Sequence, residues 1–199
     1  MQRIELSKAI ETLQNGDIVV YPTDTLYAFG VDIYNIDAVK KVFEVKKRPL
    51  GNPLPVAVSN LVDIEKIAFM SDNVRDLAEY FLPGPLTMIL KKKSVISDVV
   101  TGGLDNVAVR IPNNNVALEL LSRYGPITVT SANFHGKKVP DIISDIKMQF
   151  NSYDVAFYLD YGKLNGLPST IVDMTADKPR IVRDGAISKE EILDVIEHG

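Results

Sequence analysis

Apolar positions along the chain follow two different spacings. Where they recur every three or four residues, the pattern predicts helices, over residues 5–15, 36–47, 60–68, 72–81, 115–123 and 141–149 and from residue 188 onward. Short apolar runs rich in β-branched residues predict strands, over residues 17–21, 55–59, 86–91, 107–111, 127–130, 154–159, 169–173 and 180–183. Two helix starts carry capping signals, namely Asn35 before the second helix and the capping-box spacing of Ser188 and Glu191.

The order of these elements predicts an α/β fold. Helices and strands are intermixed along the whole chain. Within residues 86–111 and 154–183, predicted strands follow one another directly, which favours a mixed parallel and antiparallel sheet. No internal repeat, low-complexity tract or linker interrupts the pattern. We therefore expect a single domain over residues 1–199.

Composition narrows the function classes. Of the 199 residues, 46% are apolar, which is too many for a disordered chain, and none is Cys. The missing Cys excludes a disulfide scaffold, a thiolate nucleophile and Cys-ligated metal sites. His135 and His198 are the only histidines, so a His-based metal site or a Ser-His-Asp triad has little material. The P-loop and GxGxxG motifs are both missing from the sequence.

The net charge is mildly negative, and the basic residues are clustered. The chain has 22 Lys and Arg residues against 26 Asp and Glu residues, for a net charge of −4. This balance argues against a surface that binds nucleic acid throughout, but the basic runs at residues 40–48 and 91–93 allow a local basic rim. The sequence shows no signal peptide, lipidation signature or membrane-spanning apolar run, so we expect a soluble cytoplasmic protein without membrane partners.

The most informative segment is Tyr21–Gly30, which directly follows a predicted strand. Its polar residues Thr23, Asp24 and Thr25 lie where α/β folds usually bind ligands, although the same residue types are ordinary turn formers. A second polar segment, Thr128–Asn133, leaves a strand of the buried type. Its hydroxyl and amide groups can cradle a nucleotide or cap the local backbone.

Three basic residues stand at positions where anion binding is one of two interpretations. Lys46 and Arg48 lie where a predicted helix ends, so they either stabilise that end or clamp a phosphate. Arg110 interrupts an apolar strand, and it either points outward or meets an anion, because an unpaired buried charge is costly. Other short segments are weak signals when taken singly: Pro83-Gly84-Pro85, Pro168-Ser169-Thr170 and Arg183-Asp184-Gly185.

Taken together and in this order, seven segments resemble the YrdC/Sua5 family of threonylcarbamoyl-AMP synthases. They are PTDTLYAFG, KKRPLGNPL, PGPLT, VAVRIP, TSAN, PSTIVD and RIVRDGAI, and the resemblance extends from about residue 8 to residue 193. It implies an α/β fold in which a twisted mixed sheet, flanked by helices, carries a concave and positively charged cavity. It also implies the single-domain form, without the second C-terminal domain of the longer members.

The resemblance further implies a nucleotidyltransferase activity. L-threonine, bicarbonate (or CO2) and ATP, with Mg²⁺, would give L-threonylcarbamoyl-adenylate and pyrophosphate. Downstream threonylcarbamoyl-transferase proteins would then place the threonylcarbamoyl group on N6 of adenosine 37 in tRNA. The basic rim allows brief contact of this chain with tRNA.

The resemblance also assigns roles to individual residues. L-threonine would contact Thr25, Asn52, Arg110 and Ser169. ATP would contact Lys46, Arg48, Ser131, Asn133 and Arg183. Of these, Lys46, Arg48 and Arg183 would stabilise the charge that develops on the phosphates in the transition state. Thr87 and Thr130 would line the same cavity, while no side chain is expected to ligate a metal or to act as a dedicated base.

Three positions depart from the family pattern. Ala28 replaces the usual Gly of Y-G-L-G, and Lys47 replaces the usual Gly of K-G-R-P. His135 replaces Ser in S-A-N-x-S-G. An added methyl group at residue 28 would strain the backbone if that position required a positive φ.

Two alternative functions remain open at the level of the sequence. One is a YrdC-like RNA-binding module without catalysis, and the other is a related enzyme that forms a carbamoyl-adenylate. The first does not explain why the charged and polar set from Lys46 to Arg183 would be complete. The second occurs in much longer chains with zinc-finger and acylphosphatase regions, which are missing from these 199 residues.

Overall fold

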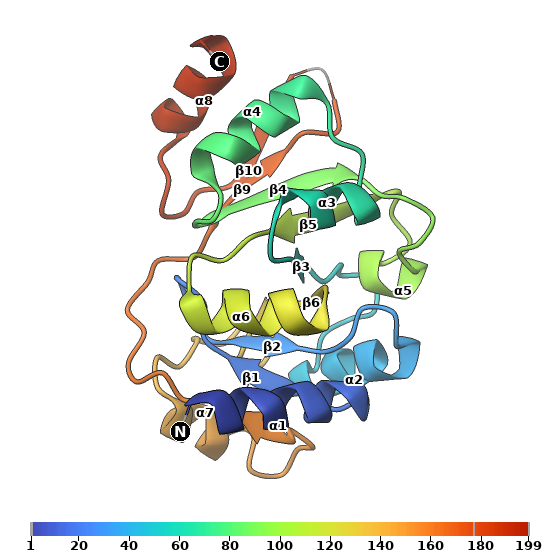
Figure 1. Ribbon diagram of the computed structural model, residues 1–199, viewed down its shortest axis with the longest axis vertical. Coiled ribbons are helices and arrows are strands. Elements are labelled where there is room, and N and C mark those ends of the chain that lie inside the picture. Colours follow the sequence, from blue (N-terminus) through green and yellow to red (C-terminus); the bar gives the residue numbers. More distant parts are fainter. Residues whose placement is uncertain (1, 177, 199) are drawn as a thin grey trace.

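The helices lie close to where the apolar spacing predicts them. The computed structural model describes the backbone of residues 2–176 and 178–198 and the side chains of residues 5–176 and 178–196, so the side chain of His198 lies outside the described residues. The helices are α1 (Gln2–Gln14), α2 (Ile36–Lys46), α3 (Leu61–Ile67), α4 (Asp72–Phe81), α5 (Asp98–Thr101), α6 (Asn115–Tyr124), α7 (Ile143–Gln149) and α8 (Lys189–His198) (Figure 1). Among them only the four-residue helix α5 was not predicted.

Both predicted capping signals are confirmed. The side chain of Asn35 accepts a hydrogen bond from the backbone N–H of Ala38 at the start of α2. Ser188 Oγ accepts from the N–H of Glu191, and the Glu191 carboxylate accepts from the N–H of Ser188 at 2.9 Å. These reciprocal bonds satisfy backbone donors that a helix start otherwise leaves without partners.

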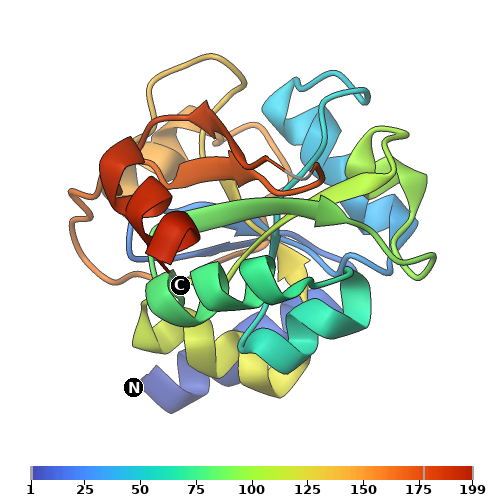
Figure 2. The same ribbon diagram turned by 90° about the horizontal axis from the view of Figure 1, so that it is seen from above.

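The strands form two mixed sheets. The strands are β1 (Val19–Tyr21), β2 (Ala28–Gly30), β3 (Val56–Ala57), β4 (Leu86–Lys91), β5 (Asn106–Arg110), β6 (Ile127–Thr128), β7 (Thr130–Ser131), β8 (Phe157–Tyr158), β9 (Thr170–Asp173) and β10 (Arg180–Arg183). One sheet has the order β7-β2-β1-β8 and the other has the order β10-β9-β4-β5-β3-β6. Each contains parallel and antiparallel pairs, and α3, α4 and α6 lie together on one side of the strands (Figure 2). The predicted α/β class with mixed strand pairing and flanking helices is confirmed.

The prediction of one continuous strand over residues 127–130 is wrong. Residues 127–128 pair with β3 in the six-stranded sheet, whereas residues 130–131 pair with β2 in the four-stranded sheet. The hydroxyl of Thr128 donates to the carbonyl of Phe29 at 3.0 Å and accepts from the N–H of Val31 at 3.2 Å. The chain therefore changes sheets at Val129, and Thr128 fastens the two sheets together at that point.

Side chains alternate between the two faces of the six-stranded sheet. Val107 and Val109 of β5 are buried in the hydrophobic core, together with Met88 of β4 and Val172 of β9. The residues between them point to the opposite face, because successive side chains of a strand alternate. Arg110 belongs to this second set, which explains how an arginine fits into an otherwise apolar strand.

No helix among the described residues is long and apolar enough to cross a membrane.

We predict that Asn114→Ala destabilises the protein through α6. Asn114 is buried, and its Oδ1 accepts from the N–H groups of Val116 at 3.0 Å and Ala117 at 3.1 Å. Loss of such a cap lowers the free energy of unfolding by about 1 to 2 kcal/mol, which urea denaturation measures. Asn113→Ala, at the exposed neighbouring position, is the matched control and should change stability by less than about 0.5 kcal/mol. Equal losses for the two variants would contradict the capping role.

Candidate active site

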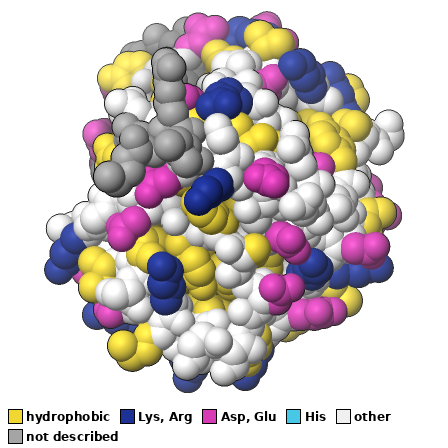
Figure 3. Space-filling view, turned by 60° about the horizontal axis from the view of Figure 1, so that its bottom comes forward, with side chains coloured by type: hydrophobic (Ala, Val, Ile, Leu, Met, Phe, Trp, Pro, Cys, Tyr) yellow, Lys and Arg dark blue, Asp and Glu magenta, His cyan; other side chains and the backbone are white. Residues whose placement is uncertain are grey.

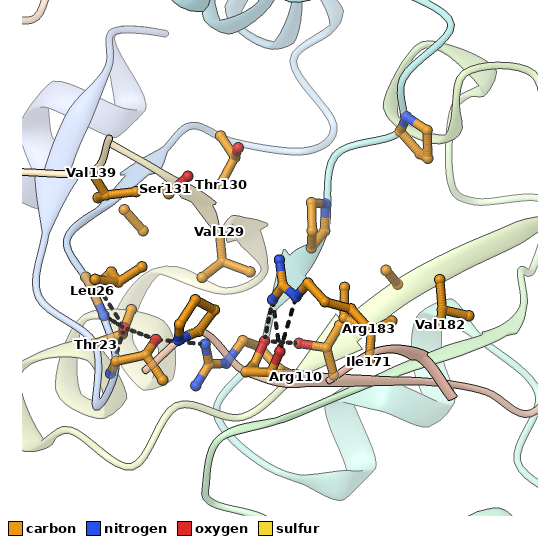
Figure 4. A pocket seen from close by; sticks show the side chains of 18 of the residues that line it. Thr23, Leu26, Arg110, Val129, Thr130, Ser131, Val139, Ile171, Val182 and Arg183 are labelled. Atoms are coloured by element: carbon orange, nitrogen blue, oxygen red, sulfur yellow. Dashed lines mark hydrogen bonds between the residues drawn. The ribbon is translucent and has the colours of Figure 1, made fainter. Parts of the chain in front are cut away.

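A cavity of about 360 Å³ lies where the two sheets meet. Its walls include the loop between β1 and β2, the strands β2, β4, β5, β7, β9 and β10, and the segments before β3 and β9 (Figure 4). Polar residues of the wall include Thr23, Thr25, Thr87, Thr130, Ser131 and Ser169, together with the guanidinium groups of Arg48, Arg110 and Arg183. Apolar residues of the wall include Ile89, Ala108 and Ile171, which alternate with core residues along their strands. The cavity thus combines a polar rim with an apolar floor.

Most of the predicted site residues are brought together in this cavity. Eight of them line it: Thr25, Arg48, Thr87, Arg110, Thr130, Ser131, Ser169 and Arg183. Lys46, Asn52 and Asn133 are outside the described lining. Their contacts with lining residues place these three immediately behind the wall. The individual roles of the eleven predicted site residues stay predictions.

Thr23 organises the loop between β1 and β2. Its Oγ1 accepts from the backbone N–H groups of Thr25 and Leu26, both at 3.1 Å, and donates to the carbonyl of Leu26 at 2.6 Å. The hydroxyl groups of Thr23 and Thr25 are 2.9 Å apart. These bonds fold the loop into a tight turn that points the hydroxyl of Thr25 toward Arg110.

Arg110 is buried, and it forms an ion pair with Asp24. Its Nη2 donates to Asp24 Oδ1 at 2.6 Å and to the carbonyl of Gly84 at 3.2 Å, and its Nη1 donates to Thr25 Oγ1 at 3.1 Å. Burial lowers the pKa of Arg110, while the Asp24 carboxylate opposes that shift. Of the two interpretations of Arg110, the one in which its charge meets an anion is therefore correct, and the anion is supplied by the protein itself.

A second arginine that lines the cavity, Arg183 of β10, is held by Ser169. Its Nη2 donates to the carbonyl of Ser169 at 2.7 Å and to the hydroxyl of Ser169 at 3.1 Å. Thr87 supports the same hydroxyl at 2.8 Å. Burial, and then the nearby positive charge of Arg110, lower the pKa of Arg183. Two guanidinium groups that line the same cavity and repel each other favour an anionic ligand in it.

Arg48 is positioned by the turn that follows α2. Its Nε donates to the carbonyl of Asn52 at 3.1 Å, and its Nη2 donates to the carbonyl of Pro53 at 2.8 Å. The ring of His135 lies 3.3 Å from Arg48 Nη1 and 3.4 Å from the side-chain nitrogen of Asn52. His135 is exposed, but it bridges two predicted site residues.

Lys46 is buried and fastens α2 to the loop after β7. Its Nζ donates to the backbone carbonyl groups of Ser131 and Asn133 and, at 3.3 Å, to Asn133 Oδ1. Burial and the nearby charge of Arg48 lower the pKa of Lys46 to about 7. In this arrangement the ammonium group holds the polar loop that contains Ser131 and Asn133.

The rest of the basic run at residues 40–48 behaves as an ordinary helix face. Lys40 Nζ lies 3.8 Å from Asp37 Oδ1, and Lys41 Nζ lies 2.9 Å from Asp17 Oδ1. On the described part of the face in Figure 3, basic and acidic side chains are interspersed with hydrophobic ones, so that face has no continuous basic surface. The functional interpretation of the run is therefore confined to Lys46 and Arg48.

Two departures from the family pattern now have a structural explanation. Lys47 has φ of 52°, the left-handed conformation that favours Gly, and it is the one non-glycine residue with positive φ in the described part of the chain. Its ammonium group lies 5.2 Å from the ring centroid of Phe134 and 5.6 Å from that of Tyr153, within the range of cation–π attraction. Ala28 lies in β2 without positive φ, so its methyl group causes no backbone strain.

The charges of the cavity wall suit a polyanion. Three arginines line it, and no carboxylate is among the described residues of the lining. The described part of the chain also contains no group of three His, Asp or Glu side chains that could hold a metal ion. A phosphate chain or a carboxylate therefore fits this wall by charge.

Comparison with known proteins identifies the family. The sequence model of the family of Sua5, YciO and YrdC proteins, which is described as "Telomere recombination", matches residues 11–185. The chain belongs to the Sua5/YciO/YrdC family. The sequence-based assignment to this family is confirmed.

Members of the Sua5/YciO/YrdC family share both the sequence and the fold of this chain. A threonylcarbamoyl-AMP synthase of Pyrococcus abyssi is 37% identical over 187 residues, which cover 92% of this chain and 55% of that protein. A protein of Methanocaldococcus jannaschii is 37% identical over 193 residues, which cover 94% of this chain and 91% of that protein. The crystal structure of Pyrococcus abyssi Sua5 complexed with L-threonine superimposes with a TM-score of 0.91 at 37% identity, over 96% of this chain and 57% of that one. The chain thus spans about half of the length of the Pyrococcus relative and nearly all of the Methanocaldococcus relative.

Sequence reasoning missed Asp24 and Thr23 as parts of the site. Both were recognised as polar residues of a promising loop, but neither was given a role of its own. One feature of the sequence points to Asp24: a carboxylate stands at the end of one strand, and a later apolar strand contains an arginine. A buried guanidinium group requires a partner of this kind. Spacing along the chain does not show which carboxylate meets which arginine.

We predict that Gly185→Ala destabilises the wall around Ser169. A methyl group at Gly185 would clash with the carbonyl oxygen of Pro168 and lie 2.5 Å from the carbonyl carbon of Ser169, so backbone must move. Forced overpacking of this kind costs about 1 to 3 kcal/mol, and calorimetry would record it as a lower Tm. Gly51→Ala is the control, because a methyl group there meets nothing within 4 Å. An unchanged Tm for Gly185→Ala would contradict the close approach.

We also predict a pH effect for Lys46→Met. Between pH of about 7 and its ordinary pKa of 10.5, Lys46 binds a proton in the unfolded chain but not in the folded one. Its contribution to the free energy of unfolding therefore rises with pH across that interval, and Lys46→Met should remove this slope. Urea denaturation at a series of pH values measures it, with Lys40→Met, an exposed lysine of the same helix, as the control. Parallel pH dependences for wild type and Lys46→Met would show that the buried amine keeps its proton.

Proposed function

We propose that this chain synthesises L-threonylcarbamoyl-adenylate from L-threonine, bicarbonate (or CO2) and ATP, with release of pyrophosphate. The observation that carries the proposal is the cavity itself, in which three arginines and the loops of Thr25 and Ser131 face one space. The structural relative with a TM-score of 0.91 is a Sua5 protein complexed with L-threonine. A cavity of about 360 Å³ has the size typical of a small-molecule site.

The reaction requires two bond-forming steps. The neutral amine of L-threonine attacks bicarbonate, forming an N–C bond and releasing water, so that a carbamate results. A carbamate oxygen then attacks the α-phosphorus of ATP in line, and the bond from that phosphorus to the bridging oxygen breaks to release pyrophosphate. Negative charge develops on the departing phosphates, and Arg48 and Arg183, with Lys46 behind the wall, would stabilise it.

Positioning supplies much of the remaining rate enhancement. Three reactants held in one cavity react as if they were parts of one molecule, which removes a large entropic barrier. Mg²⁺ would enter as part of the substrate, MgATP, because the described wall offers arginines and hydroxyl groups instead of carboxylate ligands. Ser131 and Asn133 would contact the nucleotide, and Thr25, Asn52, Arg110 and Ser169 would contact L-threonine.

The product implies a place in tRNA modification. An acyl-adenylate is an activated donor, and a transferase must consume it by moving the threonylcarbamoyl group to N6 of adenosine in tRNA. We propose that this chain hands the product to such transferase proteins in the cytoplasm and contacts tRNA at most briefly. Noncatalytic RNA binding is less well supported, because the arginines of the site lie in a cavity and not along an exposed groove. An enzyme that forms a carbamoyl-adenylate would release pyrophosphate without L-threonine, and this difference distinguishes it from the proposed synthase.

The proposal predicts the substrate requirements of pyrophosphate release. Release from MgATP should require both L-threonine and bicarbonate, and it should stop when either is omitted. Coupled detection of pyrophosphate measures the rate, and mass spectrometry identifies the adenylate. Release that ignores L-threonine would overturn the proposed function.

Arg183→Ala provides the matched test within the same assay. It should lower the rate by at least about 100-fold, the usual effect of removing a group that stabilises transition-state charge. Arg180→Ala, in the same strand, is the control, because Arg180 is exposed and pairs with Asp173 at 3.2 Å outside the cavity. Equal rates for the two variants would exclude a role of Arg183 at the phosphates.

A further inference from the structure

The buried amine of Lys46 is surrounded by hydrogen-bond acceptors. Its Nζ donates to the backbone carbonyl of Ser131, to the backbone carbonyl of Asn133 at 2.7 Å and to Asn133 Oδ1 at 3.3 Å. An ammonium group has three hydrogens and no lone pair, so these three acceptors use every hydrogen that it has. Lys46 is 1% exposed and is outside the described lining of the cavity. Its ammonium group is therefore bonded to the protein and is not directed at a ligand.

Arg48, two residues later, still has hydrogens to offer. A guanidinium group has five N–H donors. The described partners of Arg48 are the carbonyl oxygens of Asn52 and Pro53 and the ring of His135. These contacts leave two N–H groups, and Arg48 lines the cavity. Free donors on a planar group fit a phosphate, so Arg48 can bind one while Lys46 cannot.

The side chain of Asn133 is engaged within its own loop. Its Oδ1 accepts from Lys46 and from the hydroxyl of Ser131 at 2.7 Å, and its Nδ2 donates to the carbonyl of Lys137. An ammonium group can only donate and a carbonyl oxygen can only accept, so both ends fix the orientation of this amide. Asn133 is buried and, like Lys46, is outside the described lining of the cavity.

These contacts fix the direction of the Ser131 hydroxyl. Because Asn133 Oδ1 can only accept, the single hydrogen of Ser131 Oγ lies on the bond between them. No other hydrogen bond of this hydroxyl is described, so both of its lone pairs are available. Ser131 lines the cavity, where it faces the ligand as an acceptor (Figure 4). A phosphate oxygen would meet these lone pairs with its own, whereas an N–H or O–H group can donate to them.

We propose that Lys46 and Asn133 are positioning residues that hold Ser131 as an acceptor for an N–H or O–H group of the nucleoside part of ATP. This inference rests on the proposed function, and it replaces direct contact with ATP by positioning for two residues. The phosphate chain is left to Arg48 and Arg183, whose guanidinium groups line the cavity. The nucleoside is thereby directed to the loop after β7.

The number of phosphates on the ligand separates positioning from direct contact. AMP, ADP and ATP, each with Mg²⁺, are titrated into the protein at about pH 6, below the pKa of about 7 of Lys46, with binding followed by NMR. Lys46→Met should weaken all three nucleotides by the same factor of about five to ten, as expected for one lost hydrogen bond. Asn133→Ala, which keeps the buried charge, should behave in the same way. Arg48→Ala should cause a loss that grows with each phosphate, and Lys40→Met, at an exposed position of α2, is the control.

Analogues that each lack one donor identify the group that Ser131 accepts from. 2′-Deoxy-ATP, 3′-deoxy-ATP and purine riboside triphosphate lack the 2′-hydroxyl, the 3′-hydroxyl and the exocyclic amine of ATP, respectively. One of them should bind wild type about fivefold or more weakly than ATP does. That gap should close to within about twofold in Ser131→Ala and in Asn133→Ala. Ser122→Ala, an exposed serine of α6 whose hydroxyl donates to the carbonyl of Glu119, is the matched control.

The outcomes separate this inference from the proposed function. A loss in Lys46→Met that grows with the number of phosphates would overturn the positioning role, and so would an equal loss of L-threonine affinity, which should stay within about twofold. A gap between ATP and its analogues that is absent, or that persists in Ser131→Ala, would overturn the acceptor role of Ser131. Wild type that binds MgATP and L-threonine with any of these patterns would leave the proposed function intact, whereas absence of such binding would overturn both.

Discussion

The burial of one guanidinium group is the constraint on which the cavity depends. Taking such a charge out of water costs several kcal/mol unless hydrogen bonds and an opposite charge compensate it. Arg110 obtains this compensation from Asp24, Thr25 and the carbonyl of Gly84. These partners belong to two separate turns, so a single side chain of β5 ties both turns to the six-stranded sheet. The shape of one wall thus follows from the electrostatic needs of one residue.

The part of the cavity around Arg183 is held mainly by backbone. Ser169 accepts from Arg183 through its carbonyl, and Gly185 approaches the backbone on both sides of Ser169 too closely for any side chain. A similar close approach joins Gly166 to the backbone of Thr25. These contacts leave the backbone that holds Arg183 and Arg110 little room for movement. Fixed charges of this kind stabilise a developing anion without having to reorganise during the reaction.

The sequence predicted most of the elements and of the site, but not the pairings between distant segments. Long periodic helices such as α4 were predicted to the residue, whereas the three-residue strand β2 carries too little pattern to be recognised. The division of residues 127–131 between two sheets depends on which partner strands are available, and local hydrophobicity does not encode that choice. For the same reason the seven motifs located the cavity, while the pairing of Asp24 with Arg110 and the burial of Lys46 behind the wall required the structure.

The apolar floor has a consequence for how the cavity can change its size. Ile89, Ala108 and Ile171 project from β4, β5 and β9, which are hydrogen-bonded to one another in one sheet. Unlike a pocket closed by loops, this floor cannot yield to a bulkier ligand by a hinge movement. A change in the size of ligand that the cavity accepts therefore requires substitutions of side chains on these strands. Each substitution changes the space by about a methylene group, while the backbone beneath stays in place.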